Sequence, residues 1–340
     1  MPKYVTVIYL INFLAAFILS FLILALLQNS SKDWRHLKGR DKIPLLGGIG
    51  FGIALLLLFS IYVLSKKINL PQELITIFIF AYYILILELI DDWRELTLLQ
   101  KSLLQIILIS IFVFKGKSTQ IYFLPPWLNY LVSFIWIMGI TNAFNLIDIK
   151  DSFCAGVSLI ISLFFAWISF ICANPLLANF FLILAGTLAS FYFFNLSPAK
   201  MYMGNSGSHF LGFIFASLSM YLDYATLNNV AALFTPLIIL AFPIIDTSFV
   251  VFSRIQKGIS PFKKSGDHLF LRLISNGFSH RKALLLIYFI TFGWGLSAIF
   301  ILLKKQFAGL YLILALSVLS FWTVYKAREP DKPQQNPDNG

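Results

Sequence analysis

Charged residues are scarce in this chain. Only 12% of its 340 residues are Asp, Glu, Lys or Arg, against about 25% in ordinary soluble domains. Hydrophobic residues make up 59% of the chain, and the mean hydropathy is +0.83. This balance excludes a soluble multidomain enzyme and indicates an integral membrane protein.

Cysteine is also rare, and its placement argues against a thiolate metal site. Cys154 and Cys172 lie in apolar segments without the short spacing of metal ligands, so we interpret them as core thiols. The alternating ten-residue segments of a membrane β-barrel are absent as well. We therefore expect an all-α, polytopic membrane fold.

Apolar runs long enough to cross a bilayer recur along the whole chain. A spanning helix needs about 20 apolar residues, and this criterion predicts about eleven spans. The first run lacks a small-residue cleavage site, which favours a retained helix over a signal peptide. We expect one transmembrane domain over residues 1–325 and a disordered cytoplasmic tail over 326–340. The expected spans are 4–28, 47–65, 73–90, 99–116, 128–147, 154–173, 176–195, 208–225, 230–253, 283–303 and 307–325.

The basic residues give a net charge of +11 and lie in the loops between the apolar runs. With the N-terminus placed outside, 19 of the 26 Lys and Arg residues fall on the inner side. The positive-inside rule therefore predicts an outer N-terminus and a cytoplasmic C-terminus. Attraction to anionic headgroups explains the charge without nucleic acid, so membrane lipids are the expected partners.

Five polar clusters fall on the predicted cytoplasmic side, whereas the outward loops are short. We therefore expect any chemistry to take place at the cytoplasmic membrane surface. The clusters are 40–48, 91–96, 142–156, 200–208 and 254–282.

The cluster 142–156 carries two amides and two carboxylates within ten residues: Asn142, Asn145, Asp148 and Asp151. On a continuing helix this spacing of three keeps the side chains roughly on one side, where they could share a ligand. Acids at a membrane edge are functional candidates, because bare carboxylates beside hydrocarbon are costly. A polar helix end is the alternative.

Asp91 and Asp92 end the third predicted span, where carboxylates face the negative end of the helix dipole. A divalent cation would offset that repulsion, and Mg²⁺ often bridges carboxylates to substrate phosphates; a solvated acid pair is the alternative. Glu88, one turn earlier, either extends this acidic face or stays protonated. Lys101 could neutralise a phosphate or simply extend toward the headgroups.

The stretch MGNSGS, residues 203–208, precedes the eighth predicted span. Its small residues, including Gly204 and Ser208, would let backbone N–H groups approach an anion, although a tight turn would look the same. His209 follows and is expected to be packed rather than catalytic.

The loop 254–282 contains a short amphipathic piece, HLFLRLISNGF, that could lie on the membrane or cover a site. His268, beside Asp267, could bind a pyrophosphate or orient a substrate, although a lone histidine is more often structural. Asp246 interrupts the ninth predicted span, and we expect it to pair with a base across the bundle.

In this order, the motifs resemble those of the polyprenyl-phosphate N-acetylhexosamine-1-phosphate transferases, glycosyl transferase family 4. That membrane family starts lipid-linked synthesis of peptidoglycan, teichoic acid and O-antigen. The similarity covers nearly the whole chain: PLLGG after the first span, DD after the third, NAFNLID-x-x-D after the fifth, GNSGS-x-x-LGF into the eighth, then P-x-x-D and G-x-SPF-x(4)-DHL.

The resemblance implies transfer of a sugar-1-phosphate from a UDP-N-acetylhexosamine to undecaprenyl phosphate, with release of UMP, at the bacterial plasma membrane. It implies dependence on Mg²⁺, with Mn²⁺ as an alternative ion, and allows a homodimer. The implied catalytic residues are Asp91, Asp92, Asp148 and Asp151. The implied metal ligands are Asp91, Asp92 and Asn205, and the implied substrate-binding residues are Asn142, Asn145, Lys101, His268, Gly204 and Ser208.

Several positions depart from the family pattern. They are Glu88, Ile149, Ser152, Asn205, Phe270 and Leu271, where the family has a small residue, two glycines, an aspartate and two histidines. The reduced histidine cluster favours a simple sugar such as GlcNAc over the muramoyl-pentapeptide. A non-catalytic relative that binds polyprenyl phosphate without turnover is the alternative function. A transporter would show polar residues at mid-bilayer, broken helices and repeats, which the sequence does not indicate.

Overall fold

The structure is a computed structural model that describes residues 3–30, 37, 39, 42–116, 118, 119, 121, 124–224, 229–258, 260 and 266–326. In the first and last helices, side chains are described from residue 7 and up to residue 320. The predicted disordered tail lies outside this range, apart from Lys326.

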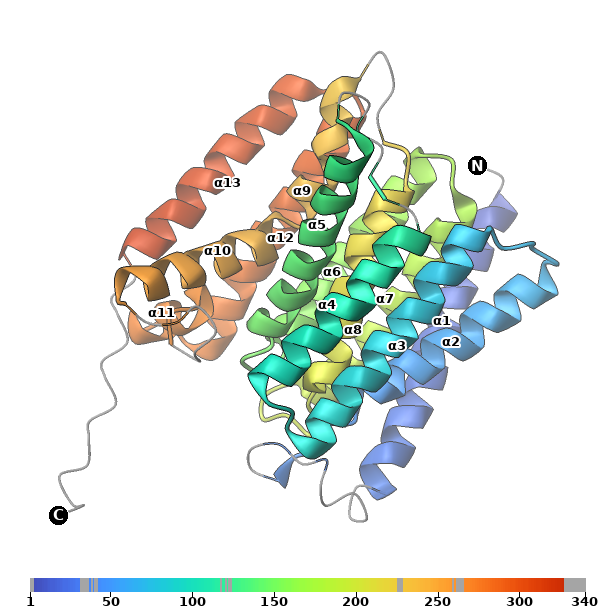
Figure 1. The fold of residues 1–340 in the computed structure, drawn as a ribbon, viewed down its shortest axis with the longest axis horizontal. Helices are drawn as coiled ribbons and strands as arrows, with labels where there is room; N and C mark the ends of the chain where they lie inside the picture. Colours follow the sequence, from blue (N-terminus) through green and yellow to red (C-terminus); the bar gives the residue numbers. More distant parts are fainter. Residues whose placement is uncertain are drawn as a thin grey trace.

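The described chain is built from helices, which confirms the predicted all-α class (Figure 1). In chain order the helices are α1 Lys3–Ser30, α2 Gly47–Ser65, α3 Gln72–Arg94, α4 Leu98–Lys115, α5 Pro126–Ile147, α6 Phe153–Ile171, α7 Pro175–Asn195, α8 Gly204–Tyr221, the 3₁₀ turn η2 Val230–Phe234, α9 Thr235–Ile239, α10 Ala241–Gln256, α11 Leu269–Ser275, α12 His280–Leu302 and α13 Gln306–Lys326.

Each of the eleven predicted spans falls on helical structure, but fewer meet the requirements for crossing a membrane. Among the described residues, eight helices are long and apolar enough, or nine if one bent pair forms a single span. α8 is not among them, because its first turns carry the polar residues Asn205 to His209. In α13 the apolar part with described side chains, Gln306–Ser320, is shorter than the other candidate spans. The membrane orientation of the termini stays a prediction.

The ninth predicted span is not one continuous helix. The segments Val230–Ile239 and Ala241–Gln256 meet at Leu240 with a bend of 63°. Pro236 and Pro243 flank the bend, and proline cannot supply an N–H to the helical ladder. The sequence indicated an interruption at Asp246 within the predicted span 230–253, and the structure places the break earlier, at Leu240.

The helices α7 and α8 form the inner part of the bundle. α7 packs between α1 and α6, and α8 packs between α3 and α5. In an 18-residue apolar stretch of α7, 72% of the residues are buried within the protein, against 17% in the corresponding stretch of α1. α10 to α13 lie at one side of the molecule in Figure 1, whereas α1 and α2 lie at the other. Polar groups on α8 are therefore enclosed by neighbouring helices instead of facing lipid.

Backbone hydrogen bonds join the PLLGG segment to the residues that lead into α8. The Tyr202 N–H donates to the Pro44 carbonyl at 2.9 Å, and the Gly47 N–H donates to the Tyr202 carbonyl at 3.0 Å. The Gly48 N–H donates to the Met203 carbonyl at 2.9 Å. A Cβ at Gly48 would collide with the backbone of Gly207, so the absent side chain allows α2 and α8 to approach closely.

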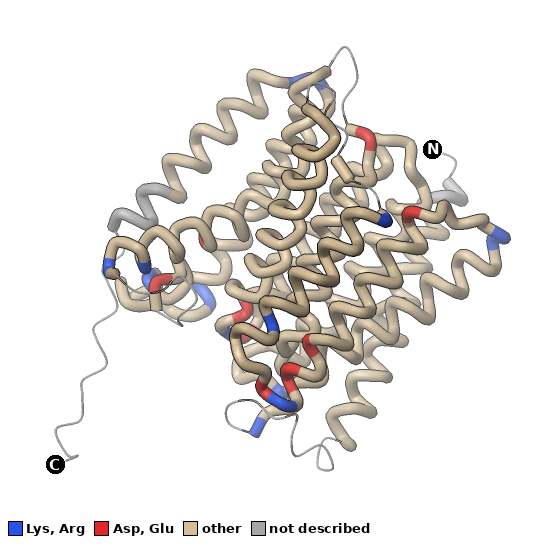
Figure 2. The backbone as a smooth tube through the Cα atoms, viewed as in Figure 1, with Lys and Arg blue, Asp and Glu red and all other residues tan. Residues whose placement is uncertain are grey.

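Charged residues gather at the ends of the helices, and long stretches between them carry none (Figure 2). The segments 44–48, 91–96 and 202–208 meet through hydrogen bonds at one end of the bundle. Among the described residues, three of the five predicted clusters therefore meet, and their position on the cytoplasmic side of the membrane stays a prediction.

The contact between α2 and α8 makes Gly48→Ala destabilising. The new methyl group meets the backbone of α8, which cannot move as a side chain can, so we expect a lower apparent melting temperature in detergent. The matched control is Gly139→Ala in α5, where nothing lies within 4 Å of the added Cβ. That control should be neutral or stabilising by about 0.5–1 kcal/mol. Equal melting temperatures for the two variants would contradict the close approach.

Candidate functional site

The Asp92 carboxylate, at the end of α3, caps the start of α8. Its Oδ1 accepts the Asn205 N–H at 2.9 Å, and its Oδ2 accepts the Ser206 N–H at 3.0 Å. The first N–H groups of a helix have no partner within the helix, and the helix dipole favours an anion there. The residue at the cap position itself, Met203, supplies no side-chain bond. Asp92 therefore supplies from a distant helix the cap that α8 lacks locally.

The glycine that opens α8 fits this arrangement. Gly204 has φ +77°, a left-handed conformation that side chains rarely adopt. A Cβ there would lie 2.7 Å from the Asp92 Oδ2. The stretch 203–208 is thus the first turn of the helix and not a loop before it. The anion that its N–H groups bind is a carboxylate of the same chain, although the sequence indicated an external one.

The neighbouring carboxylate, Asp91, faces a different set of donors. The Lys101 Nζ lies 2.8 Å from its Oδ2, and the Asn205 side-chain amide donates to the same oxygen at 3.0 Å. The Leu96 N–H donates to Oδ1 at 2.9 Å. Lys101 is carried on the first turn of α4, which Thr97 begins with a capping box. Two predicted acids, the predicted lysine and the predicted amide are thus brought together.

Asn145 joins this group through α8, whereas Asn142 does not. The Ser208 hydroxyl lies 3.2 Å from the Asn145 Oδ1 and is also within reach of the Gly204 carbonyl, at 3.2 Å. The Asn142 amide donates at 2.8 Å to the Met138 carbonyl, one turn back in its own helix. Of the two predicted amides on α5, the one nearer the helix end contacts α8.

The helix α5 does not continue through the predicted constellation. It ends at Ile147, and Asp148 already has φ −84° and ψ 58°. Asp148 and Asp151 therefore lie on a turn and not on the helix face that carries the two asparagines. Asp151 accepts the Ala199 N–H at 3.1 Å, which ties this turn to the loop before α8. The helical spacing argument was wrong for the two acids, because the helix stops before them.

Ser152, already noted as a departure from the family pattern, holds this turn in place with Asn195 and Tyr288, which the sequence did not single out. Ser152 has φ +66°, and its hydroxyl donates to the Asn195 carbonyl at 3.1 Å. The Asn195 side chain accepts the Ser152 N–H at 2.8 Å and donates to the Met201 carbonyl at 2.9 Å. The Tyr288 hydroxyl donates to the Ser152 carbonyl at 2.6 Å. The turn keeps the left-handed backbone that a glycine would favour, and the serine hydroxyl gains a hydrogen bond there.

The Asp148 carboxyl, on this turn, has a raised pKa. Burial raises the pKa of its carboxyl to about 7, and the charges of Asp92 and Asp151 add to the rise. The side chain keeps partial contact with solvent, so the surrounding protein raises the pKa without enclosing the group completely. Among the described residues none donates a hydrogen bond to this carboxyl. A neighbouring cation would favour its charged form.

His268 belongs to a second polar group, on α10 and α11. Its Nδ1 lies 2.8 Å from the Asp246 Oδ2, and Asp246 also accepts the Leu269 N–H at 2.8 Å. Asp246 pairs with a base as expected, but that base comes from the segment that leads from α10 into α11 and not from across the bundle. The amphipathic piece that follows forms α11, and its Phe270 stacks on Phe153 with ring centroids 5.4 Å apart. This aromatic contact connects the second group to the start of α6.

The donors around the acid pair suit a cation that arrives with a phosphate. Among the residues that the structure describes, no three His, Cys, Asp or Glu side chains could hold a metal by themselves. Mg²⁺ is usually bound by one or two carboxylates, with water and substrate phosphates completing the shell. Three of the four oxygens of Asp91 and Asp92 accept a single N–H from a described residue, which leaves each a second lone pair. The acid pair fits such a shared ion and does not fit a permanently held structural metal.

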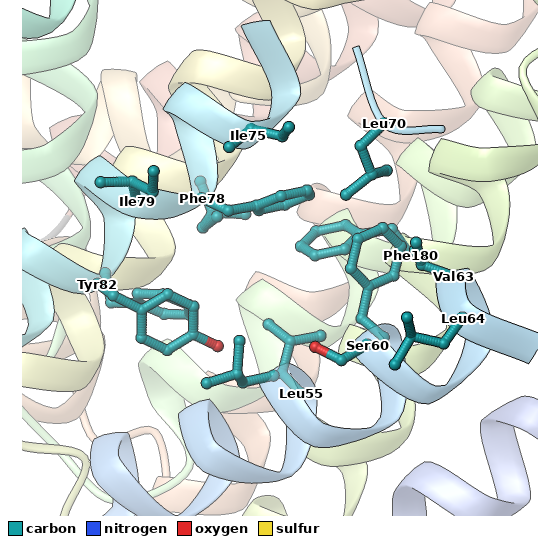
Figure 3. A pocket seen from close by; sticks show the side chains of 14 residues that line it. Leu55, Ser60, Val63, Leu64, Leu70, Ile75, Phe78, Ile79, Tyr82 and Phe180 are labelled. Atoms are coloured by element: carbon teal, nitrogen blue, oxygen red, sulfur yellow. The ribbon is translucent and has the colours of Figure 1, made fainter. Parts of the chain in front are cut away.

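An apolar cavity of about 310 Å³ lies away from these acids, between α2 and α3 (Figure 3). Leucine, isoleucine and phenylalanine side chains line most of it, with Ser60 and Tyr82 as polar members. The Tyr82 hydroxyl is already bonded to the Gly52 carbonyl at 2.8 Å. Tyr82 lies nine residues before Asp91 on α3, which is about 14 Å along a helix. This cavity suits hydrocarbon and is separate from the polar group.

The cap on α8 makes Asp92→Asn destabilising. The amide keeps one acceptor oxygen but turns an NH₂ group toward a backbone N–H, and the charge that complements the helix dipole is lost. We expect a loss of roughly 1–3 kcal/mol, measured as a lower apparent melting temperature in detergent. Asp223→Asn, which removes an exposed acid beyond the other end of α8, is the matched control and should have little effect. An unchanged melting temperature for Asp92→Asn would contradict the capping role.

Comparison with known proteins places the chain in a family. The model of glycosyl transferase family 4 matches residues 74–223, which contain the acid pair, the 142–156 cluster and the start of α8. The chain is 32% identical over 292 residues to the probable undecaprenyl-phosphate N-acetylglucosaminyl 1-phosphate transferase of Bacillus subtilis (strain 168), covering 83% of this chain and 80% of the relative.

Two further relatives have related names. The decaprenyl-phosphate N-acetylglucosaminephosphotransferase of Mycolicibacterium smegmatis is 28% identical over 279 residues, 72% of this chain and 68% of the relative. The phospho-N-acetylmuramoyl-pentapeptide-transferase of Staphylococcus carnosus is 29% identical over 210 residues, 55% of this chain and 64% of the relative. With its helical fold, its ordered motifs and these similarities, the chain belongs to glycosyl transferase family 4.

Proposed function

We propose that this protein transfers an N-acetylhexosamine-1-phosphate from a UDP-sugar to undecaprenyl phosphate and releases UMP. The site would face the cytoplasm of a bacterial plasma membrane, and the product would begin a lipid-linked glycan of the cell envelope. The single observation that carries the proposal is the convergence of Asp91, Asp92, Lys101 and Asn205 at the start of α8.

The arrangement suits phosphoryl transfer. This reaction depends on positioning and on neutralising charge more than on a strong side-chain nucleophile. A phosphate oxygen of the lipid forms a bond to the β-phosphorus of the UDP-sugar, and the bond from that phosphorus to UMP breaks. Mg²⁺, when bound with the substrate diphosphate, supplies charge neutralisation. Lys101 would contribute a second positive charge at the same place.

Asp91 is the base in this proposal, and it takes the proton of the lipid phosphate. Asp92 is less available, because both of its oxygens accept backbone N–H groups of α8, whereas the Asp91 Oδ2 meets only the side chains of Lys101 and Asn205. Asp148 and Asp151, on the turn after α5, would lie at the edge of the substrate site. Asn145 and Ser208 would contact the nucleotide. Asn142, Gly204 and His268 remain assigned to substrate binding by their motifs.

GlcNAc is the sugar that the comparisons favour. The relatives named for N-acetylglucosamine match over 83% and 72% of this chain, whereas the Staphylococcus carnosus relative named for the muramoyl-pentapeptide matches over 55%. Phe270 lies where a further histidine would follow His268, and it is buried against Phe153. This apolar contact leaves fewer polar groups for a peptide-bearing sugar.

A second candidate is a relative that binds polyprenyl phosphate without turnover. It is favoured by the hydrogen bonds that each oxygen of Asp91 and Asp92 already accepts. In that case the acids would be structural, and the site would hold a lipid phosphate through Lys101 alone.

UMP release distinguishes the two candidates. Purified protein is mixed with undecaprenyl phosphate, Mg²⁺ and, in turn, UDP-GlcNAc, UDP-GalNAc and UDP-MurNAc-pentapeptide. We expect release with UDP-GlcNAc and a loss of at least about a hundredfold in Asp91→Asn, because the base is removed. Full turnover in Asp91→Asn would reject Asp91 as the base. No release with any sugar, alongside retained lipid binding, would favour the non-catalytic candidate.

In this proposal the uncharged amide of Asn205 lowers the affinity of the site for Mg²⁺, compared with a carboxylate at the same position. In Asn205→Asp a carboxylate replaces the amide that donates to Asp91 at 3.0 Å, so two like charges face each other. We expect a lower melting temperature without Mg²⁺ and a larger rise on adding Mg²⁺ than in the wild type. Asn174→Asp, which adds the same charge at the start of α7, is the control. A Mg²⁺ response equal to that of the wild type would remove residue 205 from the cation site.

A further inference from the structure

A fully buried acid, Glu88, lies directly behind the acid pair and has no part in the mechanism above. Its side chain is 0% exposed, and it sits one turn before Asp91 on the same face of α3. Burying an ionisable group in a membrane helix costs free energy, and such groups usually pair with a partner and mark a functional site. The contacts of Glu88 identify the partner.

Glu88 is held at the junction of three helices. Its Oε2 lies 2.7 Å from the Lys101 Nζ of α4, and its Oε1 accepts the Gln105 amide of the same helix at 2.5 Å. Lys101 and Gln105 are four residues apart, so α4 presents both donors to α3 together. From α8, the His209 Nδ1 lies 3.3 Å from the Glu88 Oε2 and 2.9 Å from the Asn205 carbonyl.

His209 contacts the Glu88 carboxylate as a neutral imidazole whose Nδ1 carries the proton. A carbonyl oxygen can only accept, so the His209 Nδ1 must carry the proton in its contact with Asn205. The Nε2 is buried without a described partner, which suits a bare lone pair better than a second N–H. The positive charge opposite Glu88 is therefore that of Lys101.

Lys101 is shared between two carboxylates. Its ammonium lies 2.7 Å from Glu88 and 2.8 Å from Asp91, and its side chain is 16% exposed. With Asp91 as its only partner, the ammonium would compete directly with any cation for that carboxylate. Glu88 provides a second negative charge, so Lys101 can release Asp91 without becoming an unpaired buried cation.

We propose that Glu88 is a positioning residue that retains Lys101 beside the acid pair and keeps the negative charge of Asp91 available to a divalent cation. The proposal rests on the proposed function for the identity of the substrate, and it concerns a residue that no motif assigns. Glu88, Asp91 and Asp92 together oppose one ammonium, which leaves an excess of two negative charges, as many as a divalent cation neutralises.

The test measures cation binding apart from turnover. Mn²⁺ is titrated into the purified full-length protein with UDP-GlcNAc but without lipid acceptor, and free Mn²⁺ is followed by electron paramagnetic resonance. We expect Glu88→Gln to weaken Mn²⁺ binding by about tenfold or more, because the isosteric amide removes the charge that offsets Lys101. Glu73→Gln, at the exposed start of the same helix, is the matched control and should bind Mn²⁺ as the wild type does.

A charge-relocation variant separates this role from simple packing. Adding Asn205→Asp to Glu88→Gln returns one carboxylate to the other side of Asp91, so most of the lost Mn²⁺ affinity should return. Asn205→Asp alone is the reference: its gain in Mn²⁺ affinity should be larger in the Glu88→Gln background than in the wild type, whereas a packing defect at position 88 would leave the two gains equal. In the turnover assay, the Mg²⁺ concentration for half-maximal UMP release should rise by about tenfold in Glu88→Gln and fall again in the double variant.

A second variant keeps the proposal testable if Glu88→Gln fails to fold. Gln105→Met removes the donor that orients Glu88 but leaves both charges in place, so we expect a weaker effect of about threefold on Mn²⁺ binding. Wild-type affinity in Glu88→Gln and Gln105→Met, or a double variant no better than Glu88→Gln, would overturn the proposal. UMP release by the wild type is scored separately, so the proposed function can stand when the role of Glu88 fails. A wild type that binds no Mn²⁺ overturns the role of Glu88 in either case.

Discussion

The capping of α8 by Asp92 is the interaction on which the site depends. Two backbone N–H groups at the start of a buried helix need an acceptor, and the carboxylate that provides it belongs to a helix more than 100 residues away in sequence. These two hydrogen bonds to one carboxylate fix the end of α3 against the start of α8. Every other polar residue of the site is positioned relative to this junction.

The segments around the junction are joined by backbone hydrogen bonds, so the site does not rely on long side chains to hold its shape. Pro44 and Gly47 pair with Tyr202, and Asp151 accepts the N–H of Ala199. These contacts place the loop before α8 between the start of α2 and the turn after α5. Phosphoryl transfer requires such preorganisation, because donors that must reorganise during reaction contribute less to catalysis.

The sequence predicted the helical class and the meeting of the polar segments, because both follow from local features such as apolar run length and segregation of charge. It could not predict that Asp92 caps α8, since the partner lies far away in the chain. The sequence indicated an interruption in the ninth span, but the 63° bend at Leu240 and the left-handed Ser152 could not be predicted, for a similar reason. A proline removes an N–H from the helical ladder but does not fix where or how far the chain bends, and a serine adopts a left-handed backbone only where tertiary contacts stabilise it.

The adjacent aspartates at the end of α3 show how the fold gives different tasks to identical side chains. Successive residues on a helix point about 100° apart, so Asp91 faces α4 while Asp92 faces α8. Asp92 meets fixed backbone donors, which cannot leave without unwinding a helix. Asp91 accepts one backbone N–H through Oδ1, from Leu96, but its Oδ2 meets only the side chains of Lys101 and Asn205, which can rotate away when a ligand arrives. Asp91 can therefore exchange its side-chain partners for substrate. Asp92 meanwhile holds the start of α8 in place, and α8 carries the Asn205 that takes part in this exchange.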